Sequence, residues 1–263
     1  MRIVLSLLLF AVTLSVHAAP RAEKISWTSG GRNFDGFLVW DDASKALRPG
    51  LLMVPNWYGV NEHALAKAKT IAGKDYVILL ADVYGRGIRP ANADEAGKAA
   101  AAAYADPAAL RKYGAAALAA LRGASGKSPV DTRHIGAIGF CFGGAVALEL
   151  ARSGADLAGV ATFHGNLSTK MPAKPGAIKA PLLVMNGADD KFIPAELIAS
   201  FQDEMRQAGA DWQFVNFGGA VHCFAEPDET GTLAGCKFHE PSYRRSVRMM
   251  RDFFAEAFAR KAG

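Results

Sequence analysis

The stretch HIGAIGFCFGGAVALEL, residues 134–150, joins an apolar run to an alanine-rich amphipathic segment through one cysteine and two glycines. The run that ends near Gly139 is typical of a buried strand, and the segment after Gly144 is typical of a helix. Cys141 therefore falls at a sharp strand-to-helix joint. Packing alone would accept almost any small apolar residue there, so the thiol indicates chemistry.

Residues 139–143, Gly-Phe-Cys-Phe-Gly, match the nucleophile-elbow pattern with cysteine in place of serine. In such an elbow the backbone turns sharply, and the flanking glycines prevent clashes with neighbouring backbone. The start of the following helix directs N–H groups toward the nucleophile, where they favour a thiolate and a developing oxyanion. We predict that Cys141 is the nucleophile and that the N–H of Phe142 is one oxyanion donor. A buried, inert cysteine is the alternative.

A nucleophile on an elbow needs a carboxylate and a histidine, and they follow it in that order along the chain. The segment VMNGADDKFIP, residues 184–194, presents two carboxylates just after an apolar run. A carboxylate on a loop after a strand can accept the N–H of a distant imidazole and hold its tautomer. We predict this role for Asp190, with Asp189 as the alternative.

The histidine is expected in the segment NFGGAVHCF, residues 216–224, which ends another apolar run. His222 follows two glycines there, and it can reach both a thiol and a carboxylate. We predict that it accepts the thiol proton and returns it to the leaving group. His164, at the end of a different apolar run, is the one serious alternative, and it could line the pocket.

Short apolar runs alternate with helical patterns along the chain. Nearly continuous apolar character in the runs is typical of strands that are covered on both faces. The alternation predicts a mostly parallel α/β sheet with helices on both sides, in one domain over residues 19–263. The predicted elements are an edge hairpin (24–40), strands (50–56, 76–84, 134–140, 159–165, 181–187, 212–219) and helices (63–72, 92–122, 144–152, 195–208, 243–260).

The segments GFCFGG, NGADDKFIP and VHCF together resemble the dienelactone hydrolase family, cysteine members of the α/β-hydrolase fold. The likeness extends from about residue 24 to the end of the chain. It implies a catalytic triad of Cys141, Asp190 and His222. WYGVNEH resembles the loop that supplies a second oxyanion amide, which falls at Trp57, and DVYGR resembles the segment whose arginine binds a substrate carboxylate, which falls at Arg86.

Two positions depart from the pattern of family members that act on dienelactone. Those enzymes have a glutamate just before the second oxyanion residue, where this chain has Asn56. An amide cannot act as a carboxylate base, although it can hydrogen-bond the thiol or the oxyanion. They also have a second arginine four residues after the histidine, where Glu226 is expected to repel a substrate carboxylate. Tyr84, with Trp57 and Phe142, is expected to give the pocket an aromatic lining.

These inferences predict hydrolysis of a small ester or lactone through a cysteine-bound thioester, with no cofactor and no metal. Asn56 and Glu226 favour an alternative, a catalytically silent family member that binds a small molecule in the periplasm. Thiol redox chemistry is a third interpretation, and it is weakened because no resolving cysteine lies near Cys141 in the sequence.

The first residues, MRIVLSLLLFAVTLSVHAAP, are typical of a secretory signal. Arg2 supplies the positive start, the apolar run is too short to span a bilayer, and Val-His-Ala at 16–18 is a small-x-small cleavage pattern. We predict a signal peptide over 1–18, cleaved after Ala18 or Ala19, and export to the bacterial periplasm without stable membrane association. An uncleaved anchor is the alternative.

The net charge of +5 comes from scattered residues, so we expect no nucleic-acid partner. A small-molecule substrate and a monomer or small homo-oligomer are the expectation. Three cysteines, Cys141, Cys223 and Cys236, make an odd count for an oxidising compartment, and no Cys/His spacing indicates a metal site. A Cys223–Cys236 disulfide would leave Cys141 as the reactive thiol. Three free, buried cysteines are the alternative.

Overall fold

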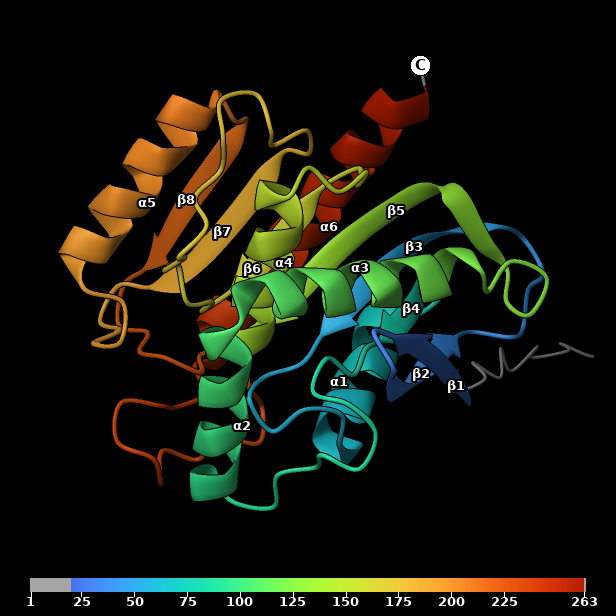
Figure 1. Cartoon of the computed structure of the whole chain (residues 1–263), viewed down its shortest axis with the longest axis horizontal. Helices are drawn as coiled ribbons and strands as arrows, with labels where there is room; N and C mark the ends of the chain where they lie inside the picture. The colour runs from blue at the N-terminus through green and yellow to red at the C-terminus, as the bar shows by residue number, and fades with distance from the viewer. Residues whose placement is uncertain (1–19, 263) are drawn as a thin grey trace, which may run out of the picture.

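The computed structural model describes residues 20–262, which form one eight-stranded sheet flanked by helices (Figure 1). The predicted signal peptide lies outside the described residues. The strands are β1 (Arg21–Ser29), β2 (Arg32–Trp40), β3 (Arg48–Val54), β4 (Val77–Leu80), β5 (Val130–Phe140), β6 (Val160–Phe163), β7 (Leu182–Gly187) and β8 (Trp212–Phe217). The helices are α1 (Glu62–Ala72), α2 (Ala93–Ala105), α3 (Pro107–Arg122), α4 (Phe142–Arg152), α5 (Ala195–Ala208) and α6 (Glu240–Ala262).

The sheet has the strand order β1-β2-β4-β3-β5-β6-β7-β8. The first two strands form an antiparallel hairpin at one edge, and β2 pairs antiparallel with β4. All pairs from β4 through β8 are parallel. The predicted hairpin and the predicted, mostly parallel sheet are both confirmed.

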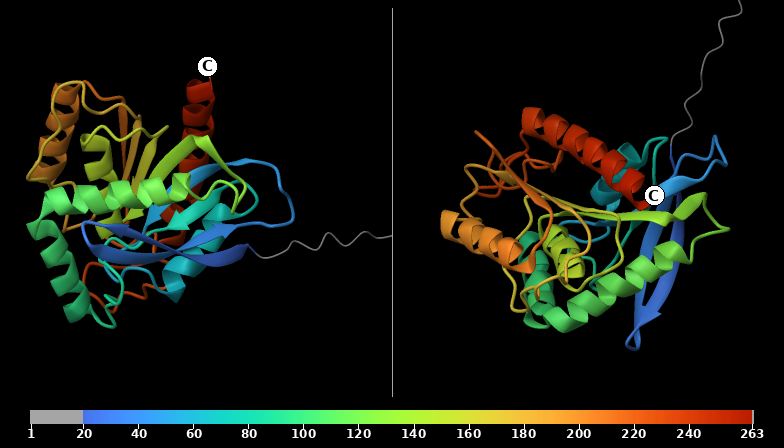
Figure 2. Two further views of the ribbon diagram at one scale, coloured as in Figure 1. Left: turned by 45° about the vertical axis from the view of Figure 1, so that its right-hand side comes forward. Right: turned by 90° about the horizontal axis from the view of Figure 1, so that it is seen from above.

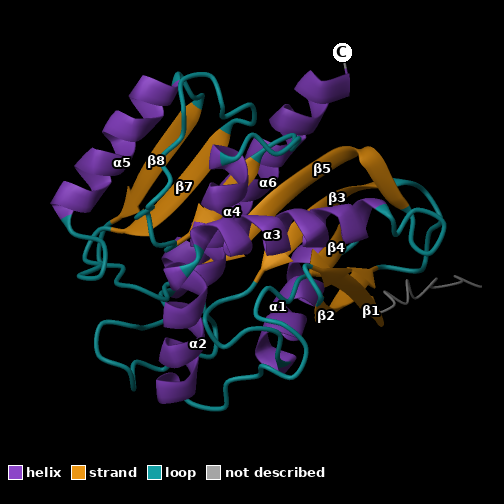
Figure 3. Ribbon diagram, in the orientation of Figure 1, coloured by secondary structure: helices purple, strands orange, loops and turns teal. Residues whose placement is uncertain are grey.

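Helices cover the two faces of the sheet (Figure 3). Viewed from above in Figure 2, α6 lies on one side of the sheet and α3 and α5 lie on the other. Alternation within β3 explains the two cores, because Leu52 and Val54 pack toward α3 and α4, whereas Leu51 and Met53 pack toward α1 and α6. Strands buried on both faces read as continuous apolar runs, which is why the sequence pattern was informative.

The helical pattern predicted over residues 92–122 is wrong as a single element. It forms two helices, α2 and α3, which are separated at Asp106. Pro107 has no N–H to continue the first helix but fits the first position of the second. The Asp106 side chain accepts a hydrogen bond from the N–H of Ala109, so it caps α3.

The parallel strands end at the same edge of the sheet, and the predicted site residues follow those ends. Asn56 and Trp57 follow β3, Cys141 follows β5, and His222 lies in the loop after β8. Polar side chains from distant parts of the sequence therefore meet above this edge, where ligands bind in open α/β sheets. Within residues 20–262, no helix combines the length and apolar character that crossing a bilayer requires.

Candidate active site

Cys141 occupies a tight turn that only glycine neighbours allow. Its φ of 51° and ψ of −116° are unusual for a residue with a side chain, and its N–H donates to the Phe163 carbonyl at 3.0 Å. A Cβ on Gly139 would lie 2.0 Å from the Gly143 carbonyl oxygen, and a Cβ on Gly143 would lie 2.0 Å from the Val54 oxygen. Both glycines are therefore required for the elbow to close. The turn leaves the thiol half-buried at the start of α4.

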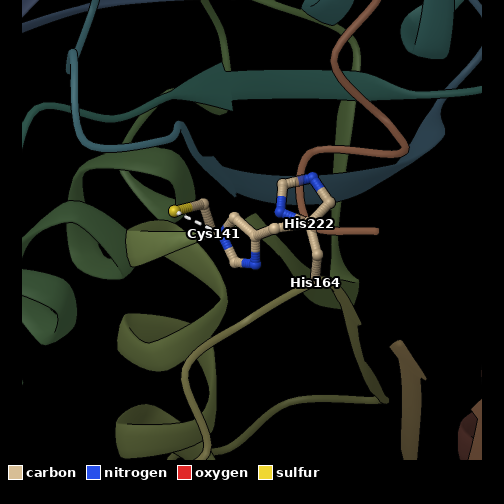
Figure 4. A group of neighbouring side chains, drawn as sticks. All are labelled: Cys141, His164 and His222. Atoms are coloured by element: carbon tan, nitrogen blue, oxygen red, sulfur yellow. Dashed lines mark hydrogen bonds between the residues drawn. The ribbon is translucent and has the colours of Figure 1, made fainter. Parts of the chain in front are cut away.

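The thiol, an imidazole and a carboxylate form one hydrogen-bonded series. His222 Nε2 lies 3.2 Å from Cys141 Sγ, and His222 Nδ1 lies 2.7 Å from Asp190 Oδ2 (Figure 4 draws the first contact). Asp190 and His222 are both buried. Asp189, the alternative carboxylate, is exposed. The structure thus brings Asp190 and not Asp189 to the imidazole.

Charged and polar neighbours control the protonation of His222. Burial alone would lower the pKa of this imidazole, but the hydrogen bonds to Asp190 and Cys141 outweigh burial and raise it to about 10. An imidazole with a raised pKa takes a proton readily from a neighbouring thiol. The series therefore has the geometry and the proton affinity that activation of a nucleophile needs.

The two amides predicted to bind the oxyanion are those of Phe142 and Trp57. Phe142 is the first residue of α4, whose leading N–H groups have no partner inside the helix. Among residues 20–262, neither the Phe142 nor the Trp57 N–H has a hydrogen-bond acceptor. The Trp57 carbonyl accepts the Tyr84 hydroxyl at 3.0 Å, and the Tyr84 ring stacks on Phe142 at 4.9 Å. Tyr84 therefore links the two segments that carry these amides.

The family described as "Dienelactone hydrolase family" matches residues 34–258. The chain belongs to this family. Membership makes it a hydrolase with the α/β-hydrolase fold.

Several relatives resemble this dienelactone hydrolase family member over most of their length. A Methylorubrum extorquens protein named "Putative carboxymethylenebutenolidase" is 29% identical over 70% of this chain and 68% of its own. A Bradyrhizobium protein named "Probable 2-oxo-3-(5-oxofuran-2-ylidene)propanoate lactonase" is 28% identical over 68% of this chain and 74% of its own. A crystal structure of a dienelactone hydrolase-like promiscuous phosphotriesterase from metagenomic libraries has a TM-score of 0.82 and 34% identity, and the match covers 92% of this chain and 100% of that one.

Asn56, where dienelactone-active family members have glutamate, stabilises its own loop. Its side-chain oxygen accepts the Tyr58 N–H at 3.1 Å, and its carbonyl accepts the Gly59 N–H at 2.9 Å. These two bonds close the turn that carries Trp57. Asn56 acts here as a turn residue of the Asx type and makes no hydrogen bond to the thiol among the described residues.

Arg86 belongs to a different contact from the one that the resemblance implies. Its guanidinium binds Asp35 in a two-pronged ion pair, with Nε 2.7 Å from Oδ2 and Nη2 2.8 Å from Oδ1. The guanidinium lowers the pKa of Asp35 to about 2. The Arg86 side chain is about half exposed. A substrate carboxylate that binds Arg86 would have to compete with Asp35.

The expectation that Glu226 repels a substrate carboxylate is corrected by its surroundings. Its side chain is 2% exposed and forms an ion pair with Lys67, which is also buried. The Lys67 ammonium also lies 4.2 Å from the centre of the Phe140 ring. Burial raises the pKa of Glu226, and Lys67 opposes that shift. Glu226 therefore belongs to the protein interior, and its charge is compensated there.

His164 lies behind the hydrogen-bonded series and not within it. Its ring is fully buried and packs edge-on against His222, with the ring centres 4.9 Å apart. Its Nε2 lies 3.6 Å from Glu226 Oε1. Burial holds the pKa of His164 well below its usual range. The structure thus assigns the thiol contact to His222 and leaves His164 next to it.

Around His222, sequence reasoning left one feature open and missed another. The Cys223–Cys236 disulfide, which the sequence left open, is present and joins the residue after His222 to a position 13 residues further along the chain. The His222 carbonyl accepts the Lys237 N–H at 3.0 Å. Phe192, an exposed aromatic residue next to the Asp190 loop, packs edge-on against the His222 ring at 5.2 Å. Its exposure was not visible from the sequence, where it reads as one more apolar residue after DDK.

Proposed function

We propose that the protein hydrolyses a small ester or lactone through a thioester on Cys141. The observation that carries this proposal is the position of His222, whose two ring nitrogens contact Cys141 Sγ at 3.2 Å and Asp190 Oδ2 at 2.7 Å. One imidazole thus connects a nucleophile to an orienting carboxylate, which is the arrangement of acyl-transfer enzymes.

In the first half of the reaction the thiol gives its proton to His222 Nε2, and the sulfur attacks the substrate carbonyl carbon. The negative charge on the carbonyl oxygen is stabilised by the N–H groups of Phe142 and Trp57. The tetrahedral intermediate collapses, the carbon–oxygen bond breaks, and the leaving alkoxide takes the proton from His222. For a lactone the leaving hydroxyl stays attached to the acyl group.

The second half regenerates the thiol. A water molecule gives a proton to His222 and attacks the thioester carbon, and the same two amides stabilise the oxyanion. The carbon–sulfur bond then breaks, and the Cys141 sulfur takes back the proton. Asp190 keeps His222 in one tautomer and orientation throughout, because its carboxylate accepts the Nδ1 proton.

The relatives support the substrate class. The Methylorubrum and Bradyrhizobium proteins carry the names of a carboxymethylenebutenolidase and a lactonase, and both names describe cleavage of a cyclic ester. The carboxylate-binding role of Arg86 remains a prediction, because Asp35 holds its guanidinium.

The test is hydrolysis of an activated aryl acetate by the wild-type protein and by Cys141→Ala. We expect turnover to fall by on the order of 10³-fold or more in the variant. Mass spectrometry of the quenched wild-type reaction should detect an acetyl group on the peptide that contains Cys141. Tight binding of an ester without turnover, unchanged in Cys141→Ala, would favour the silent binding protein instead.

Export to the periplasm is part of the same proposal. The N-terminal signal pattern and the Cys223–Cys236 disulfide both support an oxidising compartment. Alkylation of a periplasmic extract should label Cys141 and leave the other two cysteines unlabelled until a reductant is added. Recovery of the protein only from spheroplasts, with all three thiols labelled, would contradict export.

A further inference from the structure

We propose that Cys141, His164 and His222 form a binding site for a zinc ion. One ring nitrogen of each histidine and the Cys141 sulfur all lie within 4.8 Å of one another. Ligands at ordinary zinc–nitrogen and zinc–sulfur bond lengths are roughly 3.5 Å apart in a tetrahedral site. The Cys141–His222 contact of 3.2 Å is already close to that spacing. A shift of about an ångström by His164 would complete the set.

His164 is the observation that points to a ligand. It is fully buried, and neither of its ring nitrogens has a hydrogen-bond partner among the described residues. Buried polar atoms are normally paired, so an imidazole with two unpaired nitrogens requires an explanation. Figure 4 shows the His164 ring next to the His222 ring, which lies between it and the Cys141 sulfur. A metal bond would satisfy the nitrogen that lies near the thiol.

Both histidines have a carboxylate behind them. His222 Nδ1 lies 2.7 Å from Asp190 Oδ2, and His164 Nε2 lies 3.6 Å from Glu226 Oε1. Histidines that bind metals commonly donate their second N–H to a carboxylate, which fixes the ring and makes the ligating nitrogen more basic. His222 already has such a partner in Asp190, and His164 would gain one if its Nε2 closed the 3.6 Å gap to Glu226 Oε1.

The surrounding charges favour a dication. With a thiolate at Cys141, the site and its supporting carboxylates Asp190 and Glu226 carry three negative charges. Lys67, bound to Glu226, is the one positive side chain in contact with this group among the described residues. The remaining double negative charge matches Zn²⁺. Sulfur and imidazole ligands select zinc over the oxygen-seeking cations Mg²⁺ and Ca²⁺.

Zinc binding would block the reaction proposed above, because the metal takes the nucleophile and the base together. Binding releases one proton to solvent. This is the proton shared between Cys141 Sγ and His222 Nε2, because both of these atoms bind the metal in the complex. The fourth position of a tetrahedral ion remains open to water. We therefore expect a hydrolase that Zn²⁺ inhibits and a chelator restores, and only this consequence rests on the proposed function.

The test measures metal binding directly, so that it remains informative if ester hydrolysis fails. The protein, without a polyhistidine tag, is titrated with Co²⁺ and then with Zn²⁺. We expect one Co²⁺ per chain, with a sulfur-to-cobalt charge-transfer band and the strong visible bands of a tetrahedral site, all displaced by Zn²⁺. Cys141→Ser should lose the charge-transfer band, whereas loss of the exposed histidine in His63→Gln should change nothing.

His164→Asn is the decisive variant. Asparagine tolerates the positive φ of 41° at this position, and it removes the imidazole while leaving the Cys141–His222 pair. We expect Zn²⁺ affinity to fall at least about 10-fold. Loss of a residue that only hydrogen-bonds a metal ligand already costs that much, and loss of a ligand should cost more. Ester turnover is not used as the control for this variant, because the His164 ring packs against His222; a thermal melt checks that the variant is folded. Equal zinc affinity in wild type and His164→Asn would overturn the site, as would wild-type binding no tighter than that of Cys141→Ser.

If His164→Asn does not fold, as judged by its thermal melt, X-ray absorption of the zinc-loaded wild type answers the same question. One sulfur and two imidazole rings around the metal are expected. A shell of oxygen and nitrogen atoms without sulfur would overturn the proposal.

Discussion

The Tyr84 hydroxyl donates a hydrogen bond to the Trp57 carbonyl at 3.0 Å, so the loop after β4 holds the loop after β3. The same Tyr84 ring stacks on Phe142. One buried aromatic side chain therefore connects both proposed oxyanion amides. The sequence predicted only that Tyr84, Trp57 and Phe142 line the pocket. The structure adds that Tyr84 contacts both of the other residues and can hold them in position.

Tyr84→Phe removes that hydrogen bond and keeps the ring. We expect the free energy of unfolding to fall by about 1 kcal/mol, and kcat to fall more than KM changes, because the Trp57 amide loses its support. Tyr104→Phe is the matched control, since Tyr104 also packs on Phe142 but has its hydroxyl near Asn166. Ester kinetics and urea unfolding measure both effects. An equal loss of kcat in the two variants would contradict the positioning role.

Asp190→Asn tests the carboxylate against its neighbour. The Asp190 carboxylate accepts the Nδ1 proton of His222 and so fixes the tautomer, and a neutral amide in its place carries no negative charge to do this. We therefore expect kcat to fall by about 10²–10⁴-fold. Asp189→Asn removes an adjacent, exposed carboxylate, and its kcat should stay within about twofold of wild type. Steady-state kinetics on the same aryl acetate measures both. The assignment fails if Asp189→Asn is the more damaging change.

Asp35→Asn releases Arg86 and tests whether its guanidinium binds a substrate carboxylate. For an ester that carries a carboxylate, KM should decrease by roughly two- to fivefold in Asp35→Asn, the size of an exposed ion pair, and increase in Arg86→Gln. KM for a neutral ester of the same shape should be unchanged in both variants. Identical responses of the charged and neutral esters would remove Arg86 from the substrate site.

Lys67→Met leaves Glu226 as an unpaired buried carboxylate. Breaking a buried ion pair on one side costs about 3–5 kcal/mol of stability. We expect a loss of that size by urea unfolding at neutral pH. The double variant Lys67→Met with Glu226→Leu should recover most of it, because it removes both charges at similar volume. A single variant as stable as wild type would mean that the pair is not buried in solution.

The pKa of His222 predicts how stability depends on pH. Its folded-state pKa of about 10 lies above the usual 6.5, so the protonated imidazole stabilises the fold fully below pH 6.5. This contribution is lost as the pH rises through about 10. The difference in unfolding free energy between wild type and His222→Gln should therefore shrink between these limits. Cys141→Ala removes one of the interactions that raise the pKa of His222, so the pH range over which this contribution is lost should become narrower. A difference in unfolding free energy between wild type and His222→Gln that stays constant with pH would contradict the raised pKa.

The sequence by itself determined the features that depend on neighbours along the chain. Continuous apolar runs predicted the buried strands, because a strand covered on both faces has no polar side to show. The glycines around Cys141 predicted the elbow, since 139 and 143 accept no Cβ. Pro107 also marked a helix boundary in the sequence, but the alanine-rich segments on both sides led to the prediction of one continuous helix.

Only the tertiary structure decided which distant groups meet. The sequence favoured Asp190 but left Asp189 open, and the path of the loop after β7 brings Asp190 to His222. Lys67 and Glu226 are 159 residues apart, so no local pattern could predict that one neutralises the other. His164, Cys141 and His222 are also far apart in the sequence, so their proximity could not be predicted from a local pattern either. Secondary structure follows from short-range preferences, but contacts between charges and ligands depend on how the strands are ordered in the sheet.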